Sequence, residues 1–295
     1  METGSNISAI EKTTISNFNF VDESFDSSKT AHNYHLSIEV GFSVFAFTIL
    51  DIQTKKYIAW CSKNHQCSDV KQLTVNLEGY LQEHRFLTNE YRSSSVSYCD
   101  FPSTIVPNSY YNIEKEKELY TFNHQVDGGE IFRDHLLNLG AKHLYAIPEK
   151  LNRWTNQKWP KATVLHMGSV LIEQLVVFSK SVDKTCVCAN IQSKSFDLII
   201  ANNGQLKLYN SFEHGAPEDI AYYILYSLEQ LEIRNYEIEL TLSGQIEIKG
   251  KLHELLSDYI KEITFIDGKT GIILSNSFSQ PTHKGYSLFN QYLCV

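Results

Sequence analysis

The apolar positions in the first half of the chain predict a short meander of strands, then a helix and a further strand. Runs rich in Val, Ile, Phe and Thr mark the three meander strands at residues 35–41, 43–51 and 56–61. Asp69 offers an N-cap for a helix whose leucines, from Leu73 to Leu81, recur at the spacing of one helical face. Residues 95–101 then return to the strand pattern.

The second half repeats this order of elements. Its expected strands are residues 185–191, 196–201, 205–212 and 237–242. Asn203 and Gly204 form a hairpin turn, and Pro217 stands where position N1 of the next helix should be. Setting Glu39 against Asn190 gives an offset of 190 − 39 = 151 residues that aligns the two series. An internal duplication leaves such a pattern.

The remaining elements complete both halves. Between the halves we expect a strand at 119–126, a helix at 130–139 that ends at Gly140, a strand at 143–147 and a helix from Met167 to Phe178. After the second meander, apolar spacing predicts a helix over 252–263 and a short strand around Phe265. Each half is therefore expected to contain three strands, a helix, a strand, a helix and a strand.

The composition fits a globular protein with two domains. The chain has 295 residues, of which 42% are apolar, 12% aromatic and 20% charged, so it can bury a substantial core and is neither disordered nor a coiled coil. Its length favours two domains. We divide it into a polar leader at 1–33, a first lobe with inserted elements at 34–180 and a second lobe at 181–295.

The charge and the cysteines narrow the functional classes. A net charge of 26 − 34 = −8 without any block rich in Lys and Arg argues against nucleic acid as a partner. The longest apolar run, Val40–Leu50, is far shorter than the roughly 18 residues of a membrane span, and residues 1–8 lack the features of a signal peptide. We therefore expect a soluble cytoplasmic protein with reduced cysteines. Cys61, His65 and Cys67 are too few ligands for a structural zinc site, so no metal is assigned.

Four short segments resemble a known family. They are Val21–Phe25, His35–Ile38, Phe101–Ser103 and Ser287–Asn290. The chain is similar over most of its length to the uncharacterised bacterial family called domain of unknown function 3822. It also resembles the duplicated ribonuclease H-like fold of actin, sugar kinases and actin-like pilus-assembly proteins. The resemblance implies an α/β protein with the actin-like ATPase fold, in which two ribonuclease H-like lobes each hold a mixed five-stranded sheet flanked by helices.

The resemblance also implies where a nucleotide would bind. Active members of the superfamily carry an Asp-x-Gly turn in each meander, and a glycine-rich turn after the fourth strand of the second half. The candidate nucleotide-binding residues here are Glu39, Gly41, Asn190, Ser193, Ser243 and Gly244. The second turn reads Asn190-Ile191-Gln192, so its acid and its glycine are both missing. We therefore expect an eroded site with no catalytic residue and no cofactor, and keep ATP with Mg²⁺ as the alternative.

A second enzymatic reading remains open. Ribonuclease H-like nucleases hold two metal ions with carboxylates from the first strand, the first helix and the end of the fourth strand. Glu39, Glu78 and Asp100 fall near those places. Against this reading, Glu78 lies well inside its helix, and an acidic surface would repel a nucleic acid substrate.

The expected function is that of a non-catalytic scaffold or adaptor that binds another protein, by analogy with pilus-assembly relatives. Trp154 and Trp159 are candidate anchors for such a partner, although large aromatic side chains are more often part of the core. The alternative is a switch that closes around ATP with slow or no hydrolysis. The sequence indicates neither the partner nor an oligomeric state.

Overall fold

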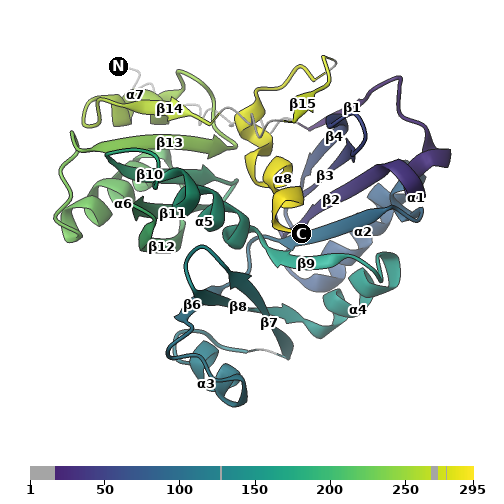
Figure 1. Ribbon diagram of the computed structural model, residues 1–295, viewed down its shortest axis with the longest axis horizontal. Coiled ribbons are helices and arrows are strands. Elements are labelled where there is room, and N and C mark those ends of the chain that lie inside the picture. The colour runs from purple at the N-terminus through teal and green to yellow at the C-terminus, as the bar shows by residue number, and fades with distance from the viewer. Residues whose placement is uncertain (1–16, 127, 267–271, 277) are drawn as a thin grey trace, which may run out of the picture.

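Two large β-sheets flank a pair of helices in the computed structural model, which describes residues 17–126, 128–266, 272–276 and 278–295 (Figure 1). The first sheet has seven strands in the order β1-β4-β3-β2-β5-β9, and β15 also pairs with β4. These strands are β1 (Phe18–Val21), β2 (Tyr34–Val40), β3 (Val44–Asp51), β4 (Lys56–Asn64), β5 (Ser93–Tyr98), β9 (Thr163–His166) and β15 (Ile273–Leu274). The predicted meander is confirmed as the antiparallel strands β2, β3 and β4, and β5 runs parallel to β2.

The second sheet has five strands in the order β12-β11-β10-β13-β14. They are β10 (Thr185–Ile191), β11 (Ser195–Asn202), β12 (Gln205–Glu213), β13 (Ile238–Gly244) and β14 (Ile263–Phe265). β10 to β12 form an antiparallel meander and β13 runs parallel to β10, as β5 does to β2. The repeated topology confirms the actin-like fold. The second sheet has the five strands expected, whereas the first gains β1 and β15 at the outer edge of β4.

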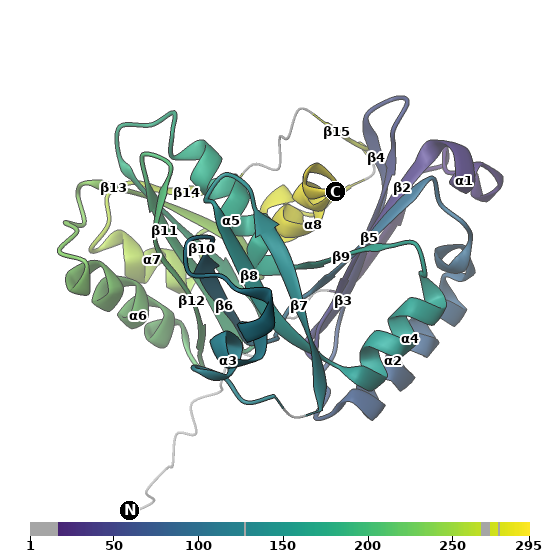
Figure 2. The ribbon, with the colours of Figure 1, turned by 60° about the horizontal axis from the view of Figure 1, so that its bottom comes forward.

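Helices cover the outer face of each sheet. α2 (Val70–Glu83) and α4 (Glu149–Lys158) pack on the first sheet, and α6 (Pro217–Gln230) and α7 (Lys251–Ser257) pack on the second (Figure 2). The predicted caps are present, since Asp69 accepts a hydrogen bond from the Gln72 N–H at 2.8 Å and Pro217 is the first residue of α6. The predicted helix over 252–263 ends earlier, at Ser257.

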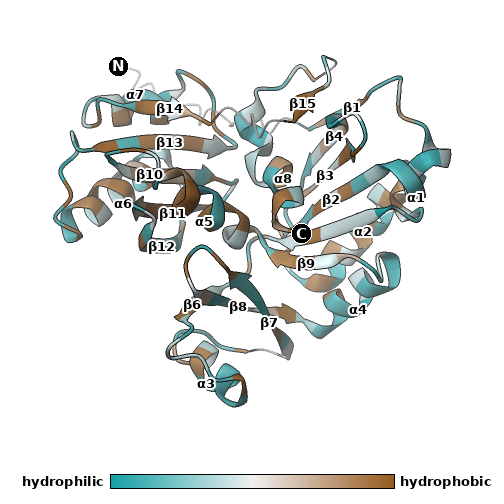
Figure 3. Cartoon of the chain, viewed as in Figure 1, coloured by the Kyte–Doolittle hydropathy of each residue, from teal (hydrophilic) through white to brown (hydrophobic). Residues whose placement is uncertain are grey.

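α5 (Met167–Phe178) and α8 (Tyr286–Asn290) lie between the two large sheets (Figure 2). Together with the inner faces of both sheets they form one apolar cluster, to which Met167, Cys188 and Phe289 belong. Figure 3 shows brown apolar stretches along the strands and helices that contribute to the apolar clusters of the protein. The segment expected to be a polar leader contributes β1 and α1 (Thr30–Asn33), while its residues 1–16 lie outside the described part of the chain.

A third sheet departs from two sequence predictions. It is antiparallel with the order β6-β8-β7, built from β6 (Ser103–Pro107), β7 (Gly129–Leu136) and β8 (Ala141–Pro148), and α3 (Glu116–Thr121) packs beside it. The predicted helix at 130–139 is wrong, because this segment forms β7, and the predicted strand at 119–126 is wrong, because α3 covers its beginning.

The physical reason lies in the buried face of β7. Asp134 and Leu136 point into the protein while Arg133 and His135 are exposed, which is the alternation of a strand. Asp134 is buried because Tyr145, Ser169 and the His166 N–H donate hydrogen bonds to it. Because Asp134 is polar but occupies a buried position, the sequence of β7 does not show the alternation of apolar and polar residues that predicts a strand.

In the described residues, the longest helices, α2 and α6, have 14 residues each, and none combines the length and the apolarity that crossing a bilayer requires.

Candidate functional site

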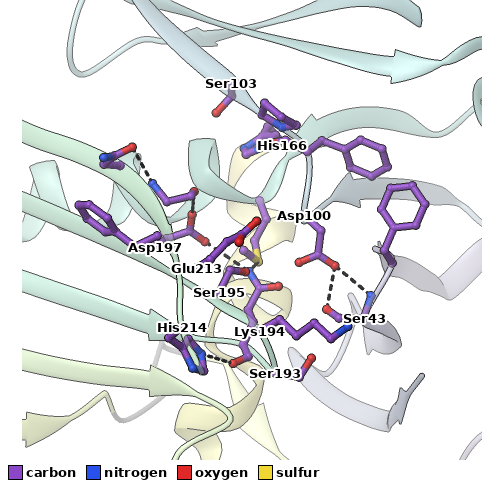
Figure 4. Close-up of a pocket in the computed structure, with 18 of the residues that line it drawn as sticks. Ser43, Asp100, Ser103, His166, Ser193, Lys194, Ser195, Asp197, Glu213 and His214 are labelled. Atoms are coloured by element: carbon purple, nitrogen blue, oxygen red, sulfur yellow. Dashed lines mark hydrogen bonds between the residues drawn. The ribbon is translucent and has the colours of Figure 1, made fainter. Parts of the chain in front are cut away.

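A pocket of about 1270 Å³ opens between the two lobes (Figure 4). Its walls come from segments far apart in the sequence. They are the β2–β3 turn, residues 65–67 after β4, residues 100–103 after β5, the junction of β9 and α5, the β10–β11 hairpin, and β12 with the residues that follow it. The two hairpins at which actin-like proteins are expected to hold phosphate therefore both border this pocket.

Asp100 fixes the first hairpin. It follows β5 with a φ of 64°, and its Oδ2 accepts hydrogen bonds from the Ser43 N–H at 3.0 Å and from the Ser43 hydroxyl at 2.7 Å. Gly41 is required by this close approach, since a Cβ there would lie 2.6 Å from the same carboxylate oxygen and 2.4 Å from the sulfur of Cys99. The Asp100 carboxylate thus occupies a backbone N–H group of the turn that a bound phosphate would need as a hydrogen-bond donor.

Asp197 projects from β11 on the opposite side of the pocket (Figure 4). It is 3% exposed and accepts hydrogen bonds from the hydroxyls of Ser211 and Tyr209 and, at 3.4 Å, from the side-chain amide of Gln192. Burial raises the pKa of Asp197 to about 6, and the negative charge of Asp100 adds to the shift. Burial likewise raises the pKa of Asp100.

The four histidines of the pocket share one hydrogen-bonding role. In each, Nε2 lies 2.9 Å from a backbone carbonyl oxygen: His65 at Gly41, His124 at Ser103, His166 at Phe101 and His214 at Gln192. A carbonyl only accepts, so each Nε2 carries the proton. The Nδ1 of His166 accepts from the Gly168 N–H at 3.0 Å, and burial lowers the pKa of His166 to about 4. Through these hydrogen bonds the four rings hold the backbone of the pocket walls in place.

Glu39, the acid predicted to face the nucleotide, is covered by α8. The hydroxyl of Ser287 donates a hydrogen bond to its Oε2 at 2.9 Å. Burial raises the pKa of Glu39 to about 7, and the charges of Asp100 and Asp197 contribute to the rise. The side chain is therefore a buried acid in contact with the C-terminal helix.

The second-lobe candidates form a structural contact between β10 and β13. Ser243 donates to Asn190 Oδ1 at 2.9 Å, and the Asn190 amide lies 3.7 Å from the sulfur of Met167. Gly244 has a φ of 82°, and a Cβ there would lie 2.1 Å from the carbonyl oxygen of Ile191. Of the six candidate nucleotide residues, Ser193 lines the pocket, and its hydroxyl is buried without a partner in the described residues.

The structure does not assemble the nuclease triad. Glu78 faces α4, where it accepts hydrogen bonds from Trp154 and Lys158 at 2.7 Å each, while Glu39 and Asp100 accept hydrogen bonds from serines elsewhere. No group of three His, Cys, Asp or Glu residues able to hold a metal ion occurs in the described part of the chain. Trp159 is buried and donates to the Leu87 carbonyl, so its suggested role as an exposed anchor is wrong.

Sequence reasoning missed Asp197 and the β12 side of the pocket. A signal was present, because Asp197 interrupts the apolar run from Phe196 to Ala201, where a buried acid must find partners. Those partners come from β12, and only the pairing of Asp197 with Ser211 across the two strands brings them within reach.

Comparisons with known proteins agree with this fold. A family model described as "Protein of unknown function (DUF3822)" matches residues 22–263. A solved structure from Bacteroides thetaiotaomicron, described as having an actin-like ATPase fold and unknown function, is 25% identical with a TM-score of 0.73 and covers 82% of this chain and 93% of its own. The PilM–PilN type IV pilus biogenesis complex is 11% identical with a TM-score of 0.59, covering 88% and 97% respectively. No match was found among curated proteins.

Proposed function

We propose that this chain, which belongs to the family of proteins of unknown function DUF3822, is a non-catalytic adaptor that binds another protein. The observation that carries the proposal is the position of Asp100. Its carboxylate accepts from the Ser43 N–H in the first hairpin, the place where a phosphate would take backbone donors. A nucleotide would have to displace a negative charge that belongs to the protein itself.

The charge of the pocket supports the same conclusion. Asp100, Asp197 and Glu213 line the pocket. Among the described residues that line it, Lys194 is the one lysine, and there is no arginine. Phosphoryl transfer depends on cations that neutralise developing negative charge. A pocket with an excess of carboxylates opposes a triphosphate and leaves hydrolysis without its electrostatic support.

Exposed aromatic residues on α6 support a protein partner. Tyr222 and Tyr226 are 59% and 45% exposed, and their rings stack at a centroid distance of 5.7 Å. Tyrosines supply large contact areas at protein interfaces with little loss of side-chain entropy. The similar PilM structure is named as a complex with PilN. That protein shares only the fold with this chain, so it serves here as an analogy for an adaptor role.

The nucleotide test is thermal unfolding of the full chain with and without millimolar ATP and Mg²⁺. A ligand at about 100 times its Kd would stabilise the folded state by about 2.7 kcal/mol and raise the Tm by several degrees. We expect a change of less than about 1 °C for the wild-type protein, because Asp100 holds the hairpin donor.

Asp100→Gly sharpens this test. Glycine tolerates the φ of 64° while the substitution frees the Ser43 N–H and removes a charge, so we expect ATP to stabilise this variant more than the wild type. Asp183→Gly, which removes an exposed acid, is the matched control and should behave as wild type. A rise of several degrees in the wild-type Tm would overturn the proposal in favour of the nucleotide switch.

The partner itself is tested with the full tagged chain in its native cells. We expect one protein to remain bound in stoichiometric amount through size-exclusion chromatography, and Tyr222→Ala with Tyr226→Ala to release it. Recovery of the chain alone or only as copies of itself would contradict the adaptor role.

A further inference from the structure

We propose that the pocket between the lobes binds an organic cation, a guanidinium or alkylammonium group that donates hydrogen bonds to its carboxylates. Asp100 enters from the first lobe, and Asp197 and Glu213 enter from the second (Figure 4). Asp219 also borders the pocket, where its carboxylate accepts hydrogen bonds from the N–H groups of Gly215 and Ala216 at 2.8 and 3.0 Å. Asp100 and Asp197 likewise accept hydrogen bonds from protein groups and would share their oxygens with a ligand, whereas Glu213 is exposed.

The neighbouring side chains do not neutralise these acids. The pocket histidines are donors to backbone carbonyls, and burial lowers the pKa values of His65 and His166, so these two rings stay uncharged at neutral pH. Lys194 is exposed on the β10–β11 hairpin, and no ion pair with it occurs in the described residues. A bound cation would supply positive charge beside these two buried carboxylates and favour their ionised form.

An independent observation is the state of Gln192. This residue lines the pocket and is 8% exposed, and its Oε1 has no hydrogen-bond partner within the described part of the chain. Its Nε2 faces the other way, where it donates a hydrogen bond to Asp197 Oδ2 at 3.4 Å and approaches the sulfur of Met167. A buried acceptor without a donor costs free energy, which an N–H group of a cation that reaches this oxygen would offset.

Aromatic walls fit the same ligand class. Phe42 and Phe101 meet at a centroid distance of 5.3 Å on one side, and Phe212 and Tyr223 stack at 4.5 Å on the other. Aromatic faces attract organic cations through the ring quadrupole and accept the planar face of a guanidinium. An inorganic cation would gain little from such walls, so the pocket favours a cation on a carbon chain.

The inference rests on the proposed function only for the source of the cation. In an adaptor, the cation would be the Arg or Lys side chain of a partner segment, and the same chemistry could come from a free amine. If no cation binds, this inference fails, but the result of the thermal-unfolding test with ATP is unaffected. If ATP raises the Tm, the adaptor proposal fails, but the result of the cation titration is unaffected.

The experiment is isothermal titration of the full chain with two probes. Agmatine presents a guanidinium without a carboxylate, and the peptide acetyl-Gly-Gly-Arg-Gly-Gly-amide presents it on a backbone. We expect saturable binding, at least about tenfold tighter for the peptide if a partner segment is the source, since the backbone adds contacts. Agmatine binding as tightly as the peptide would assign the site to a free amine.

Substitutions decide whether the binding occurs in this pocket. Asp197→Asn keeps an acceptor for Ser211 and Tyr209 and should weaken binding at least about tenfold. Lys194→Ala removes a positive charge that repels the ligand, so it should tighten binding. The effect should be only about threefold, because the Lys194 side chain is solvent-exposed. Asp183→Asn, an exposed acid outside the pocket, is the matched control and should leave binding unchanged.

Glu213→Gln keeps the test decisive if Asp197→Asn does not fold, because Glu213 is exposed on β12 and no hydrogen bond from its side chain holds the fold together in the described residues. We expect it to weaken binding about threefold. The inference is overturned if neither probe binds at 10 mM, a concentration of about the upper limit for a specific weak site. It is equally overturned if binding survives all the pocket substitutions unchanged.

Discussion

Replacing Gly244 by alanine is expected to lower the free energy of unfolding by about 4 kcal/mol. Two effects add in this position. The φ of 82° is costly for any residue with a Cβ, and that Cβ would lie 2.1 Å from the carbonyl oxygen and 2.9 Å from the backbone nitrogen of Ile191. Both opposing atoms are main chain in the paired strand β10, so neither can rotate away as a flexible side chain would. Urea unfolding followed by circular dichroism measures the change.

Gly79→Ala is the matched control for this experiment. Gly79 lies inside α2, and apart from its chain neighbours and the backbone of the helix itself nothing lies within 4 Å of the place where its Cβ would be. The same chemical change should there stabilise the protein by about 0.5–1 kcal/mol, because alanine restricts the unfolded chain and favours the helix. Equal stability of Gly244→Ala and wild type would show that β10 and β13 are not packed as described.

This result bears on how the candidate nucleotide residues are tested. Gly244 was a candidate because actin-like proteins bring a nucleotide close to a glycine-rich turn, but here the close neighbour is the protein's own strand. Loss of any ligand response in a Gly244 variant would therefore report unfolding. Ser193, which lines the pocket, offers an interpretable site for substitution.

Glu39→Gln is expected to stabilise the protein at pH 8 by about 2 kcal/mol and to destabilise it at pH 4 by about 1 kcal/mol. Burial raises the pKa of Glu39 from an ordinary value of 4.5 to about 7. Below pH 4.5 the carboxyl is protonated in both the folded and unfolded states. Between pH 4.5 and 7 only the unfolded state ionises, so the stability of the wild type falls as the pH rises and levels off above pH 7.

The size of the effect follows from that shift. That rise in the pKa of Glu39 corresponds to about 3 kcal/mol of destabilisation at pH 8, and the unpaired N–H groups of the buried amide cost the variant about 1 kcal/mol at every pH. The amide oxygen still accepts the hydrogen bond that Ser287 donates to the carboxylate. Urea unfolding at pH 4, 6 and 8 compares the two proteins.

The control is Glu254→Gln, which makes the same change at an exposed position of α7. Its stability difference from wild type should stay constant across the pH range, because the acid is in water in both states. A constant difference for Glu39→Gln as well would mean that Glu39 is ionised at no cost, and that α8 does not bury it.

One failure of the sequence predictions has a clear physical cause. β7 was taken for a helix because Asp134 occupies a core position, and only the donors from Tyr145, Ser169 and His166 make that burial tolerable. The segment over 119–126 was taken for a strand, although its beginning is helical in α3. The spacing of apolar residues predicts the buried face of an element correctly only where the polar side chains of that element are exposed to solvent.

The sequence by itself determined the repeated order of elements, the two meanders and the internal duplication. It could do so because each strand and helix shows its own local period of apolar residues, and because the offset of 151 residues aligns two such series. These are properties of residues close together in the sequence, so they can be recognised without knowledge of the tertiary contacts.

Only the tertiary structure decided what each polar residue of the site does. Asp100 binds Ser43 across 57 residues of chain, and Ser287 reaches Glu39 across 248. The same carboxylates would have suited a nucleotide cleft, a nuclease or a cation pocket if judged by residue type alone. Hydrogen bonds between distant segments set where each of these carboxylates lies, because a buried acid needs donors that the rest of the protein supplies.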